Sequence, residues 1–133
     1  MWLPALNQRV ASAARQLVRP RGLASSAMAA GHFVLIAHDH RDSEALERRL
    51  KNREAHVKRA KDYHESGEIL AAGPLVSEHG PKGQMTGSCF LLDMPTRQDV
   101  EDFIGSDPYT EGKVWGNIEI YPMNISFMSK LGK

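Results

Sequence analysis

The sequence contains a single cysteine, Cys89, among its 133 residues. One cysteine cannot form an internal disulfide and excludes a cysteine-rich zinc site, and this usage fits a reducing compartment. No apolar run approaches the ~20 residues that a membrane-spanning helix requires, so no membrane partner is predicted. Aromatic residues make up only 7% of the chain, which leaves no stacking platform for nucleic acid. An apolar content of 41% is ordinary for a globular protein, and the length fits one domain.

Acidic residues are absent from the first 30 positions, and the first one in the chain is Asp39. The same segment is rich in Ala and Ser and carries four arginines, which are Arg9, Arg15, Arg19 and Arg21. This composition is typical of a mitochondrial transit peptide, and Arg21-Gly22-Leu23 resembles a matrix-processing site. We therefore predict a transit peptide over residues 1–30 and a location in the mitochondrial matrix. The alternatives are a disordered basic arm and a cytosolic form that starts at Met28.

The remainder of the chain is mildly acidic. Without the four N-terminal arginines, 13 basic residues face 16 acidic ones, a balance of about −3. Such a body has no affinity for phosphate backbones, so no nucleic-acid partner is predicted.

The first half of the body predicts a strand followed by a long helix. Residues 32–37 are apolar and β-rich, which indicates a buried strand, and residues 38–42 form a polar loop. Ser43 is a suitable N-cap for a helix of about 22 residues that ends at Glu65, with Gly67 as the stop. The apolar positions expected to face the core are Leu46, Leu50, Val57, Ala60 and His64.

Two further strands follow. Residues 68–76 predict a strand that is broken or bent at Gly73-Pro74, and the proline implies an edge position or a bulge because it removes a ladder donor. Residues 77–83 form a glycine-containing hairpin loop, and residues 84–94 predict the next strand.

A short helix and a last strand complete the domain. Thr96 and Asp99 resemble a capping box, with aspartate replacing the usual Glu or Gln. The helix that follows presents Val100, Phe103 and Ile104 and ends at Gly105 and Asp107-Pro108. Residues 115–127 predict the fourth strand, partly by their alternating apolar positions.

The order strand, helix, strand, strand, helix, strand predicts an α+β, ferredoxin-like βαββαβ domain over residues 31–128, with a C-terminal tail at 129–133. Two helices would cover one face of a four-stranded antiparallel sheet. The other face is then most simply covered by a second copy, so we predict a homodimer of the dimeric α+β barrel type.

Asp107-Pro108-Tyr109 and His56 are the candidate site. We expect the fold to bring the carboxylate of Asp107 to the imidazole of His56, which changes charge between about pH 5 and 8 and suits general acid or base work. The carboxylate would orient the ring, and Ser88 or Tyr109 could donate a hydrogen bond to a developing oxyanion. The alternative is that His56 lies on the helix flank beside Val57 and that Asp107 caps a turn.

An ordered set of motifs resembles the YCII-related domain family over about residues 31–127. The set consists of Arg53-Glu54-Ala55-His56, the Gly67 turn, Leu70-Ala71-Ala72-Gly73-Pro74-Leu75, the strand with Gly87, and Asp107-Pro108-Tyr109. The resemblance implies ferredoxin-like dimers related to muconolactone isomerases, with a His and Asp site in a cavity between sheet and helices. It places the histidine at His56, the aspartate at Asp107 and the turn at Gly73 and Pro74, which would shape the pocket wall.

These features predict an enzyme of isomerase or lyase type that acts on a small organic molecule without a cofactor. Isomerisation, elimination and lactone chemistry all fit a lone His and Asp pair. The alternative from another class is a non-catalytic module that binds a small molecule or assembles with other copies.

Three other patterns predict no chemistry. His38-Asp39-His40, and His56 with His64, lack a recognised metal spacing, so no metal is expected. Cys89 lies mid-strand and is expected to be an inert core thiol. The basic residues of the long helix predict a solvated face with intrahelical ion pairs; they are Arg48, Arg49, Lys51, Arg53, Lys58, Arg59 and Lys61.

Overall fold

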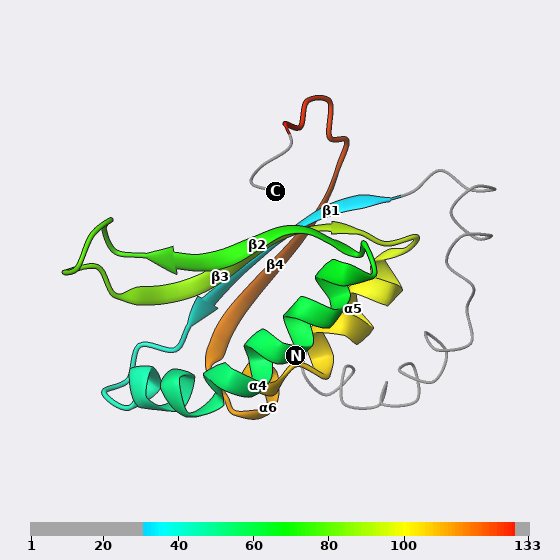
Figure 1. The fold of residues 1–133 in the computed structure, drawn as a ribbon. Coiled ribbons are helices and arrows are strands. Elements are labelled where there is room, and N and C mark those ends of the chain that lie inside the picture. Colours follow the sequence, from blue (N-terminus) through cyan, green and yellow to red (C-terminus); the bar gives the residue numbers. More distant parts are fainter. Residues whose placement is uncertain (1–30, 130–133) are drawn as a thin grey trace.

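The computed structural model describes residues 31–129, and the predicted transit peptide and most of the predicted tail lie outside them. The described chain forms four strands and three helices (Figure 1). In order they are β1 (His32–Asp39), α4 (Ala45–Glu65), β2 (Ile69–Val76), β3 (Met85–Asp93), α5 (Arg97–Gly105), α6 (Pro108–Glu111) and β4 (Trp115–Met123).

The strands form one antiparallel sheet in the order β2-β3-β1-β4, and the helices lie on one face of it (Figure 1). Leu35 of β1 is paired with Phe90 of β3 on one side and with Ile120 of β4 on the other. All three side chains are buried beneath the helices, in a core that also contains Val100, Phe103 and Ile104 of α5. The predicted ferredoxin-like fold is confirmed.

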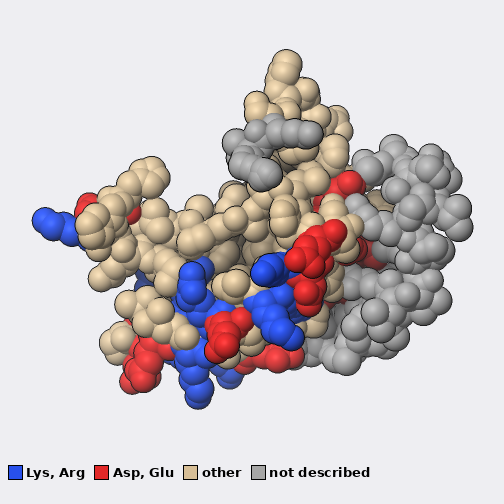
Figure 2. Space-filling view, viewed as in Figure 1, with Lys and Arg blue, Asp and Glu red and all other residues tan. Residues whose placement is uncertain are grey.

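The sheet face that bears no helix is apolar and only partly covered within the subunit. Val34, Ile36 and Leu91 are half-buried there, and Tyr121 is 49% exposed. Figure 2 shows that the charged side chains on the visible side gather over the helices, while the part above them is mostly uncharged. The described chain therefore has a charged surface over the helices. On the opposite face of the sheet it has exposed apolar side chains.

The proline of β2 lies in an edge strand, as its missing N–H donor requires. The predicted break at Gly73-Pro74 is wrong, because the pairing with β3 runs without a shift from Gly73 opposite Cys89 to Pro74 opposite Ser88. The irregularities lie one or two positions away, between Ile69 and Ala71 and between Leu75 and Val76. Edge position alone is therefore enough to accommodate the proline.

The N-cap of α4 is Glu44 and not Ser43, and no side chain makes a capping hydrogen bond there. The carboxylate of Asp42 accepts a hydrogen bond from the Glu44 backbone N–H at 3.0 Å, and its carbonyl accepts from the Ala45 N–H at 3.1 Å. Asp42 also pairs with Arg48, which lowers the pKa of its carboxyl far below its ordinary range. The prediction of Ser43 as N-cap was wrong, because the turn that Asp42 holds continues through Ser43 and the helix begins at Ala45.

The buried stripe of α4 is polar. Leu46, Leu50 and Val57, which were expected to face the core, are 39–56% exposed. The residues of the helix that are buried are Ala45, Arg49 and His56. Ala60, another of the expected positions, does pack against the core, so α4 faces the sheet with both apolar and ionisable side chains.

The second half contains a helix that the pattern did not predict. Thr96 caps α5 as expected, since its hydroxyl accepts from the Asp99 N–H at 3.1 Å. Asp107-Pro108 ends α5 but also starts α6, with Asp107 as N-cap and Pro108 in the first turn. The last strand ends at Met123, four residues before the predicted end at residue 127.

Candidate functional site

A cavity of about 550 Å³ lies between α4 and the β2–β3 side of the sheet. Its lining is mainly apolar, with a few ionisable and hydroxyl groups. The lining residues are Arg49, Arg53, His56, Val57, Ala60, Lys61, His64, Ile69, Leu70, Ala71, Ala72, Gly73, Pro74, Met85, Ser88, Phe90 and Tyr109. The predicted wall residues Gly73 and Pro74 and the predicted hydrogen-bonding residues Ser88 and Tyr109 are all among them.

The expected contact between His56 and Asp107 is present. Nδ1 of His56 lies 2.9 Å from Oδ1 of Asp107, across 51 positions of sequence. Asp107 is fully buried and His56 is 9% exposed. The long helix α4 and the start of α6 thus place an imidazole and a carboxylate in direct contact at the cavity.

The carboxylate of Asp107 has two further donors. The backbone N–H of Tyr109 donates to Oδ1 at 2.8 Å, which is the capping bond of α6. The guanidinium of Arg59 donates to Oδ2 at 3.2 Å and is itself held by the Phe103 carbonyl and the Ser106 hydroxyl, each at 2.8 Å. Asp107 therefore caps a helix and also binds His56. The sequence had suggested these two roles as alternatives, and the structure shows both contacts.

Aromatic rings surround the imidazole of His56. The ring of Tyr109 stacks on it with centroids 3.9 Å apart and planes at 14°, while Phe90 and Trp115 present edges at 6.2 Å and 5.8 Å. Among the described residues, Nε2 of His56 has no hydrogen-bond partner. One ring nitrogen is thus held by Asp107, and the other remains available on a side chain that lines the cavity.

Tyr109 links the imidazole to a second polar group. The guanidinium carbon of Arg49 lies 4.7 Å from the centroid of the Tyr109 ring, a cation–π contact. Burial raises the pKa of the Tyr109 phenol, and the positive charges of Arg49 and Arg53 oppose that rise. The phenol therefore stays protonated at neutral pH and is able to donate a hydrogen bond.

Arg49 is buried at the cavity and links Asp39 of β1 to Ser88 of β3. Its Nη1 donates to both oxygens of Asp39, at 2.9 and 3.1 Å, and its Nη2 donates to the hydroxyl oxygen of Ser88 at 3.0 Å. The indole N–H of Trp115 donates to the same Ser88 oxygen at 3.2 Å. Burial raises the pKa of Asp39, and Arg49 opposes that rise. Because Ser88 already accepts two bonds, its own hydroxyl hydrogen is the part that it can offer to a ligand.

The prediction of a solvated basic face with intrahelical ion pairs is wrong for Arg49 and Arg59. Arg49 is 2% exposed and pairs with a strand residue, and Arg59 pairs with Asp107 at the start of α6. A sequence signal for the inward direction of Arg49 was present. Arg49, His56 and Tyr63 recur every seven residues and therefore lie on one side of α4. Sequence reasoning also missed Asp39 and Trp115, whose partners come from distant segments.

Three further features of the described residues concern cysteine chemistry, metal ions and membranes. Burial raises the pKa of the Cys89 thiol, which fits an inert side chain. Across residues 31–129, no cluster of three or more His, Cys, Asp or Glu side chains is arranged to hold a metal ion. No helix in the same range has the length and apolar character needed to cross a membrane.

The sheet order and the helices on one face define a ferredoxin-like α+β fold, with a cavity between α4 and the sheet. The YCII-related domain matches residues 32–124, and the chain therefore belongs to the YCII-related family. The resemblance drawn from the sequence motifs is confirmed.

Relatives of this chain include protein YciI of Escherichia coli O6:H1, which is 31% identical over 98 residues that cover 71% of this chain and 98% of that protein. An uncharacterised protein of Haemophilus influenzae is 29% identical over 72% of this chain and 99% of its own length. Among solved structures, the 5-chloro-2-hydroxyhydroquinone dehydrochlorinase of Burkholderia phenoliruptrix AC1100, in complex with 2,5-dihydroxybenzoquinone, gives a TM-score of 0.62 at 21% identity. The similarity covers 70% of this chain and 93% of that one. At this identity the similarity concerns the fold, which is one that a small-molecule enzyme uses.

Proposed function

We propose that the protein is a cofactor-independent acid/base enzyme of isomerase or lyase type that acts on a small organic molecule through His56 and Asp107. The observation that carries this proposal is the 2.9 Å contact between Nδ1 of His56, which lines the cavity, and Oδ1 of the buried Asp107. A buried ion pair used only for stability gains little over well-packed apolar groups. A buried histidine that is oriented by a carboxylate and keeps one nitrogen free suits proton transfer.

The proposal gives each group a role. An ionised carboxylate only accepts hydrogen bonds, so Nδ1 of His56 carries the hydrogen and Nε2 carries the lone pair. Nε2 would remove a proton from the substrate, and Asp107 would stabilise the imidazolium that results. The Tyr109 phenol and the Ser88 hydroxyl would donate to the oxygen on which negative charge develops. The imidazolium would then return the proton to another carbon, or to the leaving group in an elimination.

The dehydrochlorinase with the same fold supports the lyase variant of this proposal. Its name describes the removal of chloride and a hydrogen from a hydroxylated ring, and its structure contains a quinone. Loss of HCl from such a ring requires a base but no redox cofactor. A cavity walled by Phe90, Tyr109 and aliphatic residues in this chain would suit a ring of similar size.

Changing His56 to Asn is expected to lower proton transfer by at least about a hundredfold, because the variant keeps a polar side chain but no base. A panel of small quinols, keto acids and lactones is incubated with the protein in D₂O, and deuterium uptake or conversion is followed by ¹H NMR. The matched control is His79→Asn, which removes an exposed loop histidine outside the cavity lining.

An unchanged rate for His56→Asn on a compound that the wild type converts would contradict the proposed mechanism. If panel compounds bind but none is converted or deuterated, the non-catalytic binding module becomes the better account, and the cavity is its supporting observation.

The half-covered apolar face of the sheet supports a homodimer as part of the proposal. A second copy would bury Val34, Ile36, Leu91 and Tyr121. Light scattering then gives a mass of about twice the 14.8 kDa of the chain. A monomer at micromolar concentration would remove this part of the proposal.

We also propose that the protein is delivered to the mitochondrial matrix, a proposal supported by the acid-free, arginine-containing segment of residues 1–30. The full chain and a form that starts at Met28 are each fused to a fluorescent protein. Import of the full chain alone is the expected result, and equal import of both would contradict it.

A further inference from the structure

The charges in the cavity lining have one sign. Arg49, Arg53 and Lys61 are formal cations, and none of the 17 lining residues is an aspartate or glutamate. The body of the chain is mildly acidic, so this is a local property of the site and not of the composition. A ligand that enters this cavity therefore meets positive charge from α4 together with an apolar wall from β2 and β3.

The three cations differ in their availability. Arg49 is buried and already donates to Asp39 and Ser88. Arg53 and Lys61 have no ion pair or hydrogen bond with any residue from 31 to 129. Arg53 is thus an exposed guanidinium at the rim of the cavity, and its donors are not used by any described residue.

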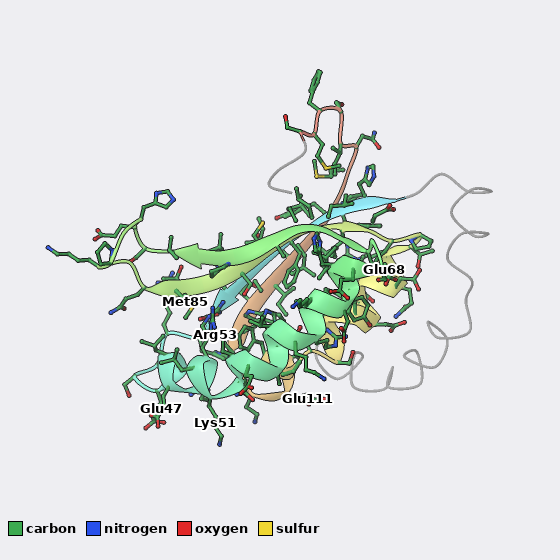
Figure 3. All side chains as sticks on the ribbon, in the orientation of Figure 1. Glu47, Lys51, Arg53, Glu68, Met85 and Glu111 are labelled. Atoms are coloured by element: carbon green, nitrogen blue, oxygen red, sulfur yellow. The ribbon has the colours of Figure 1, made fainter. Side chains whose placement is uncertain are left out.

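The side chain of Arg53 also points from α4 toward the sheet (Figure 3). Figure 3 shows that it extends from α4 toward the sheet, where Met85 of β3 lies, whereas Glu47 and Lys51 of the same helix extend away from the sheet. Its positive charge acts on the Tyr109 phenol, as the influence on the pKa of that group shows. Arg53 precedes His56 by three positions, so the two side chains are neighbours on one face of the helix.

We propose that the cavity selects a small carboxylate with an apolar or aromatic body, and that Arg53 binds the carboxylate while the body lies against β2 and β3. The planar fork of a guanidinium matches the two oxygens of a carboxylate better than the ammonium of Lys61 does. Bound in this way, the ligand places the carbon skeleton beside Nε2 of His56. The inference deepens the proposed function by naming the class of substrate, and it rests on that function only for the reaction that follows binding.

The test compares the binding of benzoate and benzamide, which have nearly the same shape but differ in charge, by calorimetry and by ¹H–¹⁵N NMR of the arginine Nε–H groups. Benzoate is expected to bind at least tenfold more tightly than benzamide and to shift the Arg53 signal. Its affinity should fall as salt concentration rises. Arg53→Gln should weaken benzoate about tenfold to a hundredfold and leave benzamide unchanged, since it removes a charged hydrogen bond. The matched control is Lys51→Gln, which removes the same charge from the same helix on the side away from the sheet.

Three results would overturn the inference: equal binding of acid and amide, an unchanged affinity of Arg53→Gln for benzoate, or no shift of the Arg53 signal at millimolar benzoate. A loss caused by Lys61→Gln in place of Arg53→Gln would also overturn it. Benzoate binding to His56→Asn keeps the two proposals separate. If His56→Asn binds benzoate with the wild-type affinity and also converts substrates at the wild-type rate, the acid/base function is wrong while the carboxylate site is supported.

Discussion

Replacement of Asp107 by asparagine is expected to leave the protein folded and to lower proton transfer by about 10²–10⁴-fold, the range that a positioned acid or base contributes. Asparagine is a good N-cap, so the bond from the Tyr109 N–H that starts α6 should persist. Because Nδ1 of His56 and the Tyr109 N–H share Oδ1, an amide oxygen that keeps this cap also keeps the imidazole hydrogen on Nδ1. The rate falls because the neutral amide no longer stabilises the imidazolium that forms.

Two measurements check this prediction. Deuterium uptake reports the rate, and ¹⁵N shifts of the imidazole report which nitrogen carries the hydrogen. Glu111→Gln is the control, because it removes one negative charge from an exposed position of the same short helix. A variant that keeps the wild-type rate with the hydrogen still on Nδ1 would show that the negative charge of Asp107 does not support the reaction. Asp107→Ala, which loses the cap and leaves Arg59 without its carboxylate, should in addition lower the free energy of unfolding by about 3–5 kcal/mol.

Arg49→Met is expected to lower the free energy of unfolding by about 3–5 kcal/mol at neutral pH, because it leaves the carboxylate of Asp39 buried without its cation. The side chains of Arg49 and Asp39 are only 3% and 7% exposed. Methionine fills much of the volume of the arginine stem. The loss of stability therefore reports mainly the missing positive charge and only to a small extent a new cavity. Urea unfolding measures the loss, with Lys51→Gln as the control.

The pH dependence of the Arg49→Met variant follows from the same pair. Burial raises the pKa of Asp39 above its ordinary 3.8, and Arg49 is the main group that opposes that rise. Without Arg49 the folded state binds a proton more readily than the unfolded state, so stability is kept at low pH and is lost as pH rises above about 4. The double variant Arg49→Met, Asp39→Asn should remove this dependence. A stability deficit that does not change with pH would show that the charge of Asp39 is not its cause.

Sequence alone determined the order of the elements and two members of the site. Period-two and helical spacings, Gly67, the edge proline and the Thr96 cap are local signals, and each depends on backbone geometry that a few neighbouring residues fix. The ordered motifs indicated the family and pointed to His56 and Asp107. The short helix α6 and the start of α4 at Ala45 were missed, because several side chains in those segments can satisfy the same backbone donors.

Only the tertiary structure decided which side of α4 faces the sheet and what that side does. The apolar residues Leu46, Leu50 and Val57 predicted one orientation, but the helix turns Arg49 and His56 inward because partners on other segments compensate them. Those partners, Asp39 and Asp107, are respectively 10 and 51 positions from the residues that they bind. No local spacing encodes such contacts. They form only when strands and helices pack, since a buried ionisable group is stable only where its partner is also present.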